Sequence, residues 1–177
     1  MFIKEVRKEM TAKAGQKCTA IRRAIVPEHL VEDVQIALGK ALAQTTIGHP
    51  LAEGVRMGAL ASHAQQADVA ERVARLAEGN EIIFGERDGF APVGEGVLDG
   101  AFYSPTLLLC RDALKNETVH SVEAFGPVST LMPYEDFDEA LHLAAKGRGS
   151  LVGSVITKTP ALAAQAVMHA GAFHGRI

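Results

Sequence analysis

Hydrophobic positions recur along the chain with two spacings, one typical of helices and one typical of strands. Ile3, Val6 and Met10 are separated by three or four residues with charges between them, which predicts an amphipathic helix over 4–13 that stops at Gly15. The same spacing predicts helices over 27–49, 64–79, 135–145 and 159–171. Apolar runs predict strands over 19–26, 81–84, 103–110, 128–134, 150–157 and from 174 onward.

Proline and glycine mark several element boundaries. Pro27 suits the first turn of the helix over 27–49, and Gly48 suits its end. Thr159 is expected to cap the last helix, with Pro160 at its first position.

Three stretches between these boundaries carry more specific predictions. Pro105 predicts an edge or irregular strand over 103–110, because proline cannot donate to a strand ladder. The apolar run over 150–157 predicts a buried strand, and the glycines in 85–100 predict a surface loop. Helices alternate with strands throughout, which predicts the α/β class with a mostly parallel sheet flanked by helices.

Composition and charge limit the classes of partner. Of the 177 residues, 47% are hydrophobic and 22% are charged, as in globular domains, and the net charge is -3. We therefore expect no nucleic-acid partner, because the basic surface that such proteins need is not present. No apolar run approaches the roughly 20 residues that span a bilayer, so we expect no membrane partner. Two cysteines make no disulfide framework, and a reduced, cytoplasmic location is expected.

Residues 15–20 (GQKCTA) place a cysteine in a turn. Cys18 follows a predicted helix and Gly15 and precedes a predicted strand, a position from which a thiol can be presented to a pocket. Lys17 beside it would favour the thiolate, which is the nucleophilic form. The alternative is that Cys18 is a small buried hydrophobic residue.

Residues 123–127 (EAFGP) combine a carboxylate, an aromatic ring and a Gly-Pro turn. In an extended segment Glu123 and Phe125 point to the same side, so both can meet one ligand. The carboxylate suits the hydroxyls of a ribose, and the ring suits a flat heterocycle. The alternative is an ordinary turn with a solvated glutamate and a core phenylalanine.

Together the two motifs resemble those of the aldehyde dehydrogenase superfamily. GQKCTA is similar to its active-site cysteine motif and EAFGP to its second signature, and the two occur in the same order. Segments 57–60, 102–106 and 149–153 also resemble segments of that superfamily, so the resemblance covers essentially the whole chain. Residues 10–23 and 119–127 are most similar to the ring-opening branch of phenylacetate degradation (the PaaN/PaaZ group), in which a MaoC-type hydratase domain follows the dehydrogenase.

The resemblance implies the fold of the aldehyde dehydrogenase catalytic domain and a role for three residues. Cys18 would be the nucleophile, and its backbone N–H would help to form the oxyanion hole. Glu123 would bind the hydroxyls of the nicotinamide ribose, and Phe125 would pack against the nicotinamide of NAD or NADP. An aldehyde, expected to be a CoA-linked ring-opened semialdehyde, would be oxidised to an acid through a thiohemiacetal and a thioester.

The resemblance also implies that residues 1–177 form one nucleophile-bearing domain. The cofactor-binding, oligomerisation and MaoC-type hydratase segments are expected to be absent, so NAD or NADP would be bound mainly by a domain outside this chain. We expect such a fragment to be inactive alone and the full-length protein to be a homo-oligomer. Two alternatives stay open: another aldehyde dehydrogenase, including a CoA-acylating type, and a non-catalytic assembly module.

Four further predictions concern single residues. Arg22 and Arg23 are expected to be a solvated surface pair, with contact to a phosphate of a CoA-linked substrate as the alternative. Cys110, in an apolar run, is expected in the core. His120 is expected to cap or pack the loop before Glu123. The histidines show no metal-ligand spacing, so no metal site is predicted.

Overall fold

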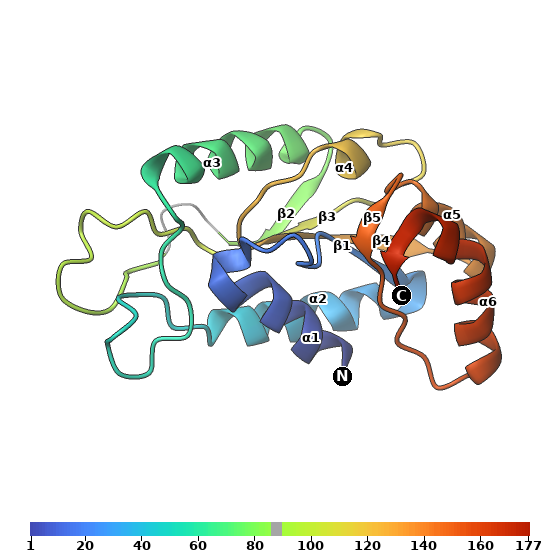
Figure 1. The fold of residues 1–177 in the computed structure, drawn as a ribbon, viewed down its shortest axis with the longest axis horizontal. Helices are drawn as coiled ribbons and strands as arrows, with labels where there is room; N and C mark the ends of the chain where they lie inside the picture. Colours follow the sequence, from blue (N-terminus) through green and yellow to red (C-terminus); the bar gives the residue numbers. More distant parts are fainter. Residues whose placement is uncertain (86–89) are drawn as a thin grey trace.

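A four-stranded sheet lies at the centre of the computed structural model, which describes residues 1–85 and 90–177 (Figure 1). Its order is β1-β4-β3-β2, and only the β3–β2 pair is antiparallel. A separate parallel pair joins β5 and β6. The strands are β1 (Arg23–Pro27), β2 (Glu81–Phe84), β3 (Thr106–Leu109), β4 (Val128–Tyr134), β5 (Ser150–Val152) and β6 (His174–Arg176). The α/β class with a mostly parallel sheet is confirmed.

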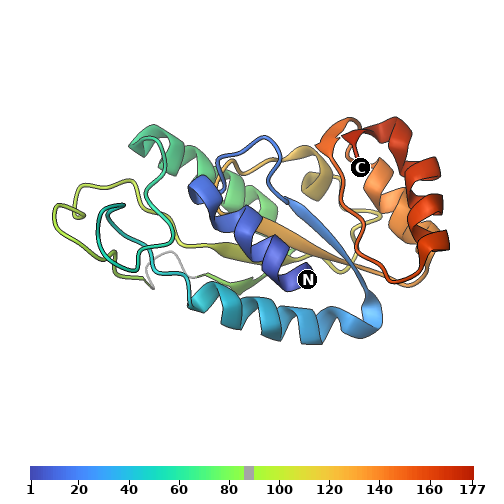
Figure 2. The ribbon, with the colours of Figure 1, turned by 60° about the horizontal axis from the view of Figure 1, so that its bottom comes forward.

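Helices cover both faces of the central sheet, and Figure 2 shows the two layers from a second side. One face packs against α1 (Phe2–Thr11) and α2 (Val31–Ala43), and the other packs against α3 (His63–Ala77) and α4 (Thr118–Ser121). Helices α5 (Phe137–Ala145) and α6 (Pro160–Ala170) lie next to the β5–β6 pair. Short 3-10 turns are η1 (Ala12–Gly15), η2 (Glu28–Leu30) and η3 (Gly171–Phe173).

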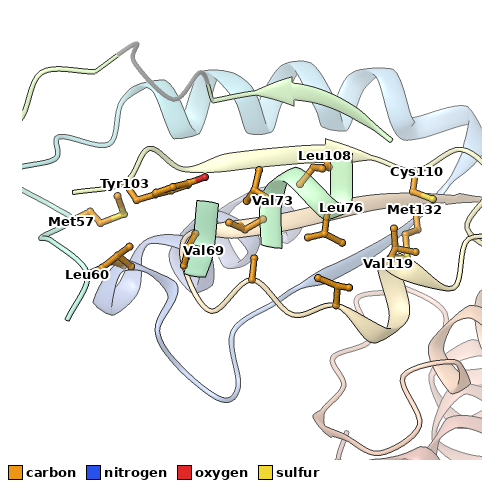
Figure 3. Close-up of a cluster of buried hydrophobic side chains, with 14 of the residues drawn as sticks. Met57, Leu60, Val69, Val73, Leu76, Tyr103, Leu108, Cys110, Val119 and Met132 are labelled. Atoms are coloured by element: carbon orange, nitrogen blue, oxygen red, sulfur yellow. The ribbon is translucent and has the colours of Figure 1, made fainter. Parts of the chain in front are cut away.

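Side chains of β3, and of Cys110 directly after it, are divided between two hydrophobic cores. Leu107 and Leu109 pack with α1 and α2, whereas Leu108 and Cys110 pack with α3 (Figure 3). Successive side chains of a strand point to opposite faces, so a strand covered on both sides is apolar without interruption. Each large apolar side chain that is buried this way contributes about 1.5–3 kcal/mol. Cys110 is 1% exposed, which confirms the prediction of a core position.

Of the two alternatives predicted for 103–110, the edge strand is wrong, whereas the pairing with β2 is irregular, with a register shift between Ile82 and Phe84. Strand β3 lies between β4 and β2, and all four of its residues are buried. Pro105 precedes the strand, so no N–H is lost from the ladder. The N–H of Thr106 donates to the Pro127 carbonyl oxygen at 2.9 Å and opens the pairing with β4.

Two predicted elements are shorter than their apolar patterns. The helix expected over 27–49 is a 3-10 turn followed by α2, which ends at Ala43. The chain then extends so that Gly48 approaches Val93, where a Cβ would lie 2.0 Å from the Val93 carbonyl oxygen. The strand expected over 19–26 begins only at Arg23, because a turn closes with the Ala20 N–H donating to Lys17.

The buried strand predicted over 150–157 is also wrong. Strand β5 has three residues, Leu151 is 56% exposed, and Val155 and Ile156 are each 42% exposed. Hydrophobicity predicts that a segment can be buried, but burial also needs a covering element, and the described part of the chain leaves the side of this segment that carries Leu151 exposed. In the loop expected over 85–100, residues 86–89 lie outside the described residues, and 90–100 contain no helix or strand.

Candidate active site

Cys18 lies on an exposed turn between α1 and β1. The backbone before it is tightly wound: Lys13, Ala14 and Gly15 have φ of 53°, 51° and 69°. Left-handed φ values are unfavourable for side chains with a Cβ, and such strain concentrates at functional sites. Ala14 and Gly15 are themselves buried. Cys18 is therefore not the buried hydrophobic residue of the alternative interpretation.

The segment 123–127 follows α4 and leads directly into β4. Glu123 is exposed, Ala124 is buried and Phe125 is half-buried. Glu123 and Phe125 both contact the guanidinium of Arg22, so they face the same side as the spacing predicts. Hydrogen bonds from the Gly126 N–H to Ala124 O and from the Val128 N–H to Gly126 O, both 2.8 Å, fix the turn.

The fold brings these two motifs into direct contact. A Cβ on Gly15 would lie 2.1 Å from the Gly126 carbonyl oxygen, so the two backbones touch with no side chain between them. The parallel pairing of β1 with β4 causes this contact, because each motif precedes one of these two neighbouring strands. The sequence predicts both motifs, and the sheet determines that they meet.

A hollow of about 540 Å³ opens beside the contact. Its lining includes Phe125, Gln16 and the backbone turn at 58–61. Gln16 connects that turn to the cysteine segment, because its Oε1 accepts from the Ala61 N–H at 2.8 Å. The aromatic ring of Phe125 thus faces a space open to a ligand.

Lys17 is expected to favour the Cys18 thiolate, but its ammonium group forms an ion pair with Glu9. Lys17 Nζ lies 2.6 Å from Glu9 Oε2, and the two side chains are 26% and 19% exposed. This ion pair ties the cysteine turn back to α1. The ammonium group thus has a carboxylate partner on the preceding helix.

The prediction of a solvated Arg22–Arg23 pair is wrong. Arg22 is turned toward the two motifs, and its side chain is 17% exposed. Arg23 is turned toward the end of α5, where its guanidinium donates to Leu143 O at 2.8 Å and Ala144 O at 3.2 Å. Burial lowers the pKa of both guanidinium groups, and for Arg22 the Glu123 carboxylate opposes the shift. The sequence carries one signal of this burial. A strand in a parallel sheet is covered on both faces, so neither of two adjacent arginines on it is expected to face solvent.

His120 packs and links segments, as predicted. Its Nε2 lies 2.7 Å from the Ala113 carbonyl oxygen, which can only accept, so Nε2 carries the proton. Nδ1 then accepts from Arg23 at 3.2 Å. Burial lowers the pKa of His120, and the nearby Arg23 and Lys146 charges add to that shift.

Among the described residues, no group of three or more His, Cys, Asp or Glu side chains is placed to hold a metal ion. No helix within 1–85 or 90–177 is long and apolar enough to cross a bilayer.

Comparison with known proteins identifies the family of this chain. The family model described as "Aldehyde dehydrogenase family" matches residues 2–174, and the chain belongs to that family. It is 43% identical over 177 residues to a 3,4-dehydroadipyl-CoA semialdehyde dehydrogenase from Aromatoleum evansii, covering 100% of this chain and 34% of the relative. It is 45% identical over 124 residues to the protein MaoC of Klebsiella aerogenes, covering 68% and 35%. The chain thus spans about a third of the length of these relatives.

A solved structure shows the same fold. Betaine aldehyde dehydrogenase from Staphylococcus aureus, crystallised with NAD+, aligns with a TM-score of 0.86 at 24% identity. The alignment covers 98% of this chain and 33% of that chain.

Proposed function

We propose that residues 1–177 are the nucleophile-bearing domain of an NAD(P)-dependent aldehyde dehydrogenase of aromatic catabolism. The observation that carries the proposal is the contact between the exposed Cys18 turn and the Glu123–Phe125 turn. The substrate proposed is a CoA-linked semialdehyde, because the Aromatoleum relative, similar over the whole chain, is named for one. Ring-opened intermediates of phenylacetate degradation (the PaaN/PaaZ branch) are the corresponding class. Cytoplasmic location and homo-oligomerisation of the full-length protein are parts of the same proposal.

In the proposed reaction Cys18 attacks a carbonyl carbon. Its thiolate Sγ forms the new C–S bond while the carbonyl π electrons move to oxygen, giving a thiohemiacetal oxyanion. The Cys18 N–H makes no hydrogen bond within the described residues, so it is available to the developing charge. A nicotinamide cofactor, when bound, supplies the hydride acceptor that converts this adduct to a thioester on Cys18. Attack by water on the thioester then releases the acid and restores the thiol.

Glu123 and Phe125 fit the requirements of the nicotinamide riboside. Glu123 is 56% exposed, and its Oε1 accepts from Arg22. Its Oε2 has no hydrogen-bond donor among the described residues, so this oxygen is available to a hydroxyl of a ligand. Phe125 lines the open hollow and presents a flat apolar surface. Holding a ligand ring close to the Cys18 turn is the main advantage that such an arrangement supplies. In this proposal the cofactor-binding, oligomerisation and MaoC-type hydratase segments lie outside residues 1–177, and the chain alone does not turn over aldehyde.

The experiment that tests the proposal reads the nucleophile directly. The 177-residue chain is treated with p-nitrophenyl acetate, and acetylation is located by peptide mass spectrometry. We expect rapid acetylation of Cys18, protection by prior incubation with an aldehyde, and no reaction at Cys110. Cys18→Ser should abolish the adduct.

A slow reaction at Cys18, equal to that of a free thiol in a short peptide, would contradict the proposal and favour the assembly-module alternative. Addition of CoA to the acetylated chain distinguishes the remaining alternatives. Release as acetate supports the hydrolytic enzyme, whereas transfer to acetyl-CoA supports a CoA-acylating one.

A further inference from the structure

The guanidinium of Arg22 touches both motifs at once. Nη2 donates to Gly15 O at 2.6 Å and to Lys17 O at 3.4 Å, and Nη1 donates to Gly126 O at 2.6 Å. Nε donates to Glu123 Oε1 at 3.2 Å, although the two residues are 101 positions apart. We propose that Arg22 is the positioning residue of the active site, which sets the Cys18 turn relative to Glu123 and Phe125. This inference rests on the proposed function.

The bond to Lys17 acts on the group that Cys18 would use in catalysis. In a trans peptide the C=O and the following N–H point in opposite directions. The Lys17 carbonyl accepts from Arg22 and from the Ala20 N–H, so the peptide plane between Lys17 and Cys18 is held from the carbonyl side. The Cys18 N–H therefore points away from the guanidinium. Arg22 thereby orients the oxyanion donor without touching the substrate.

The other side of the guanidinium holds the cofactor-facing residues. The Glu123 carboxylate accepts from Nε, and the Arg22 cation lies 5.2 Å from the centroid of the Phe125 ring. A cation at this distance from a ring face is attracted by the ring quadrupole. One side chain thus fixes the direction of both the carboxylate and the ring.

Arg22 can do this because its own backbone is fixed. Its carbonyl oxygen accepts from the Thr130 N–H at 2.9 Å, at the point where β1 begins to pair with β4. Arg22 and Arg23 are consecutive, so their side chains leave the strand on opposite sides. Only Arg22 reaches the motifs, whereas Arg23 binds the end of α5. Arg23 is therefore a matched control: an adjacent, similarly buried arginine with different contacts.

The test compares Arg22→Met, Arg22→Lys and Arg23→Met in the 177-residue chain. The first measurement is the acetylation rate of Cys18 by p-nitrophenyl acetate, normalised to the folded fraction. Arg22→Met should slow acetylation by roughly 10- to 100-fold, because misplacement of a reacting group by about 1 Å costs on that order. Arg22→Lys should recover only part of the rate, since lysine keeps the charge but lacks the guanidinium fork. Arg23→Met should leave the rate of the folded chain unchanged.

The second measurement is hydrogen exchange of the segments 12–20 and 122–128. Both should exchange faster together in Arg22→Met than in Arg23→Met. Parent-like acetylation in Arg22→Lys, or equal slowing in Arg22→Met and Arg23→Met, would overturn the positioning role while the proposed function stands. If Arg22→Met does not fold, the Arg22→Lys rate decides. Absence of Cys18 acetylation in the parent chain would instead overturn the proposed function and, with it, the positioning role.

Discussion

The carbonyl oxygen of Gly126 occupies the space that a side chain on Gly15 would need. A Cβ there would lie 2.1 Å from that oxygen, and Gly15 has a left-handed φ of 69°. Both requirements select glycine, the residue that has no Cβ and tolerates positive φ. The two carbonyl oxygens, of Gly15 and Gly126, both accept from Arg22 at 2.6 Å. Direct backbone contact and a shared cation thus join the cysteine turn to the Glu123 segment.

Substitution of Gly15 by alanine should therefore separate the two motifs. The positive φ alone costs roughly 1–2 kcal/mol, and the clash with Gly126 adds to it. Gly54→Ala is the matched control, because Gly54 has φ of 79° and nothing within 4 Å of its Cβ position. Urea unfolding should show a larger loss of stability for Gly15→Ala than for Gly54→Ala. Equal losses of unfolding free energy in the two variants would mean that the close contact with Gly126 does not contribute to the effect of Gly15→Ala.

Arg23 should matter for stability through the end of α5. Arg23→Met leaves the Leu143 carbonyl without its side-chain donor, whereas the Ala144 carbonyl keeps the Gly147 N–H at 3.3 Å. We expect a loss of about 1–3 kcal/mol for the unsatisfied Leu143 group. Arg148→Met serves as the control, because the Arg148 side chain is 82% exposed and pairs only with Glu117 among the described residues. Exposed ion pairs of this kind contribute about 0–1 kcal/mol. Thermal unfolding of the two variants compares them, and a smaller loss in Arg23→Met than in Arg148→Met would be the contrary result.

His120 should make stability depend on pH below neutrality. Burial lowers the pKa of His120 from its usual value of 6.5, so the unfolded chain takes up the proton first as the pH falls. Stability from this group is therefore fully present above pH 6.5 and is lost as the pH falls toward the lowered pKa.

The difference between the parent chain and His120→Gln isolates this contribution from that of the carboxylates. In urea unfolding between pH 7 and pH 5, we expect His120→Gln to lose less stability than the parent with acidification. His29→Gln, at an exposed position, should follow the parent curve. A pH dependence in His120→Gln identical to that of the parent would refute the assignment.

Ser129 should be a site where removal of a polar group helps. Its Oγ is buried in β4 and has no hydrogen-bond partner within the described residues. Ser129→Ala should therefore raise the free energy of unfolding by about 1 kcal/mol, because an unsatisfied hydroxyl no longer has to be desolvated. Thr106→Val on β3 is the opposite case, since Thr106 Oγ1 donates to Ser104 O at 3.1 Å. Thr106→Val should lower the free energy of unfolding. Chemical denaturation of both variants tests whether the two changes in unfolding free energy have opposite signs.

The order of elements and the two motifs can be predicted from the amino-acid sequence alone. Spacing of apolar residues predicted α1, α3 and α6 to within a few residues, and β2 and β4 with the observed limits. Both patterns are local, because a helix repeats every three or four residues and a strand every two. The motif containing Cys18 and the motif containing Glu123 are likewise short enough to be read from neighbouring residues.

Which residues support those two motifs depends on the three-dimensional fold. Contacts of Arg22 with Glu123 and of Gly15 with Gly126 join positions about a hundred residues apart, and local periodicity carries no information about them. The same applies to the pairing of Lys17 with Glu9 and to the inner position of β3. Sheet order and side-chain direction set these relationships, because they depend on which strands become neighbours. The exposed face of β5 is the converse case: its apolar residues predicted burial, and the described chain supplies no cover for them.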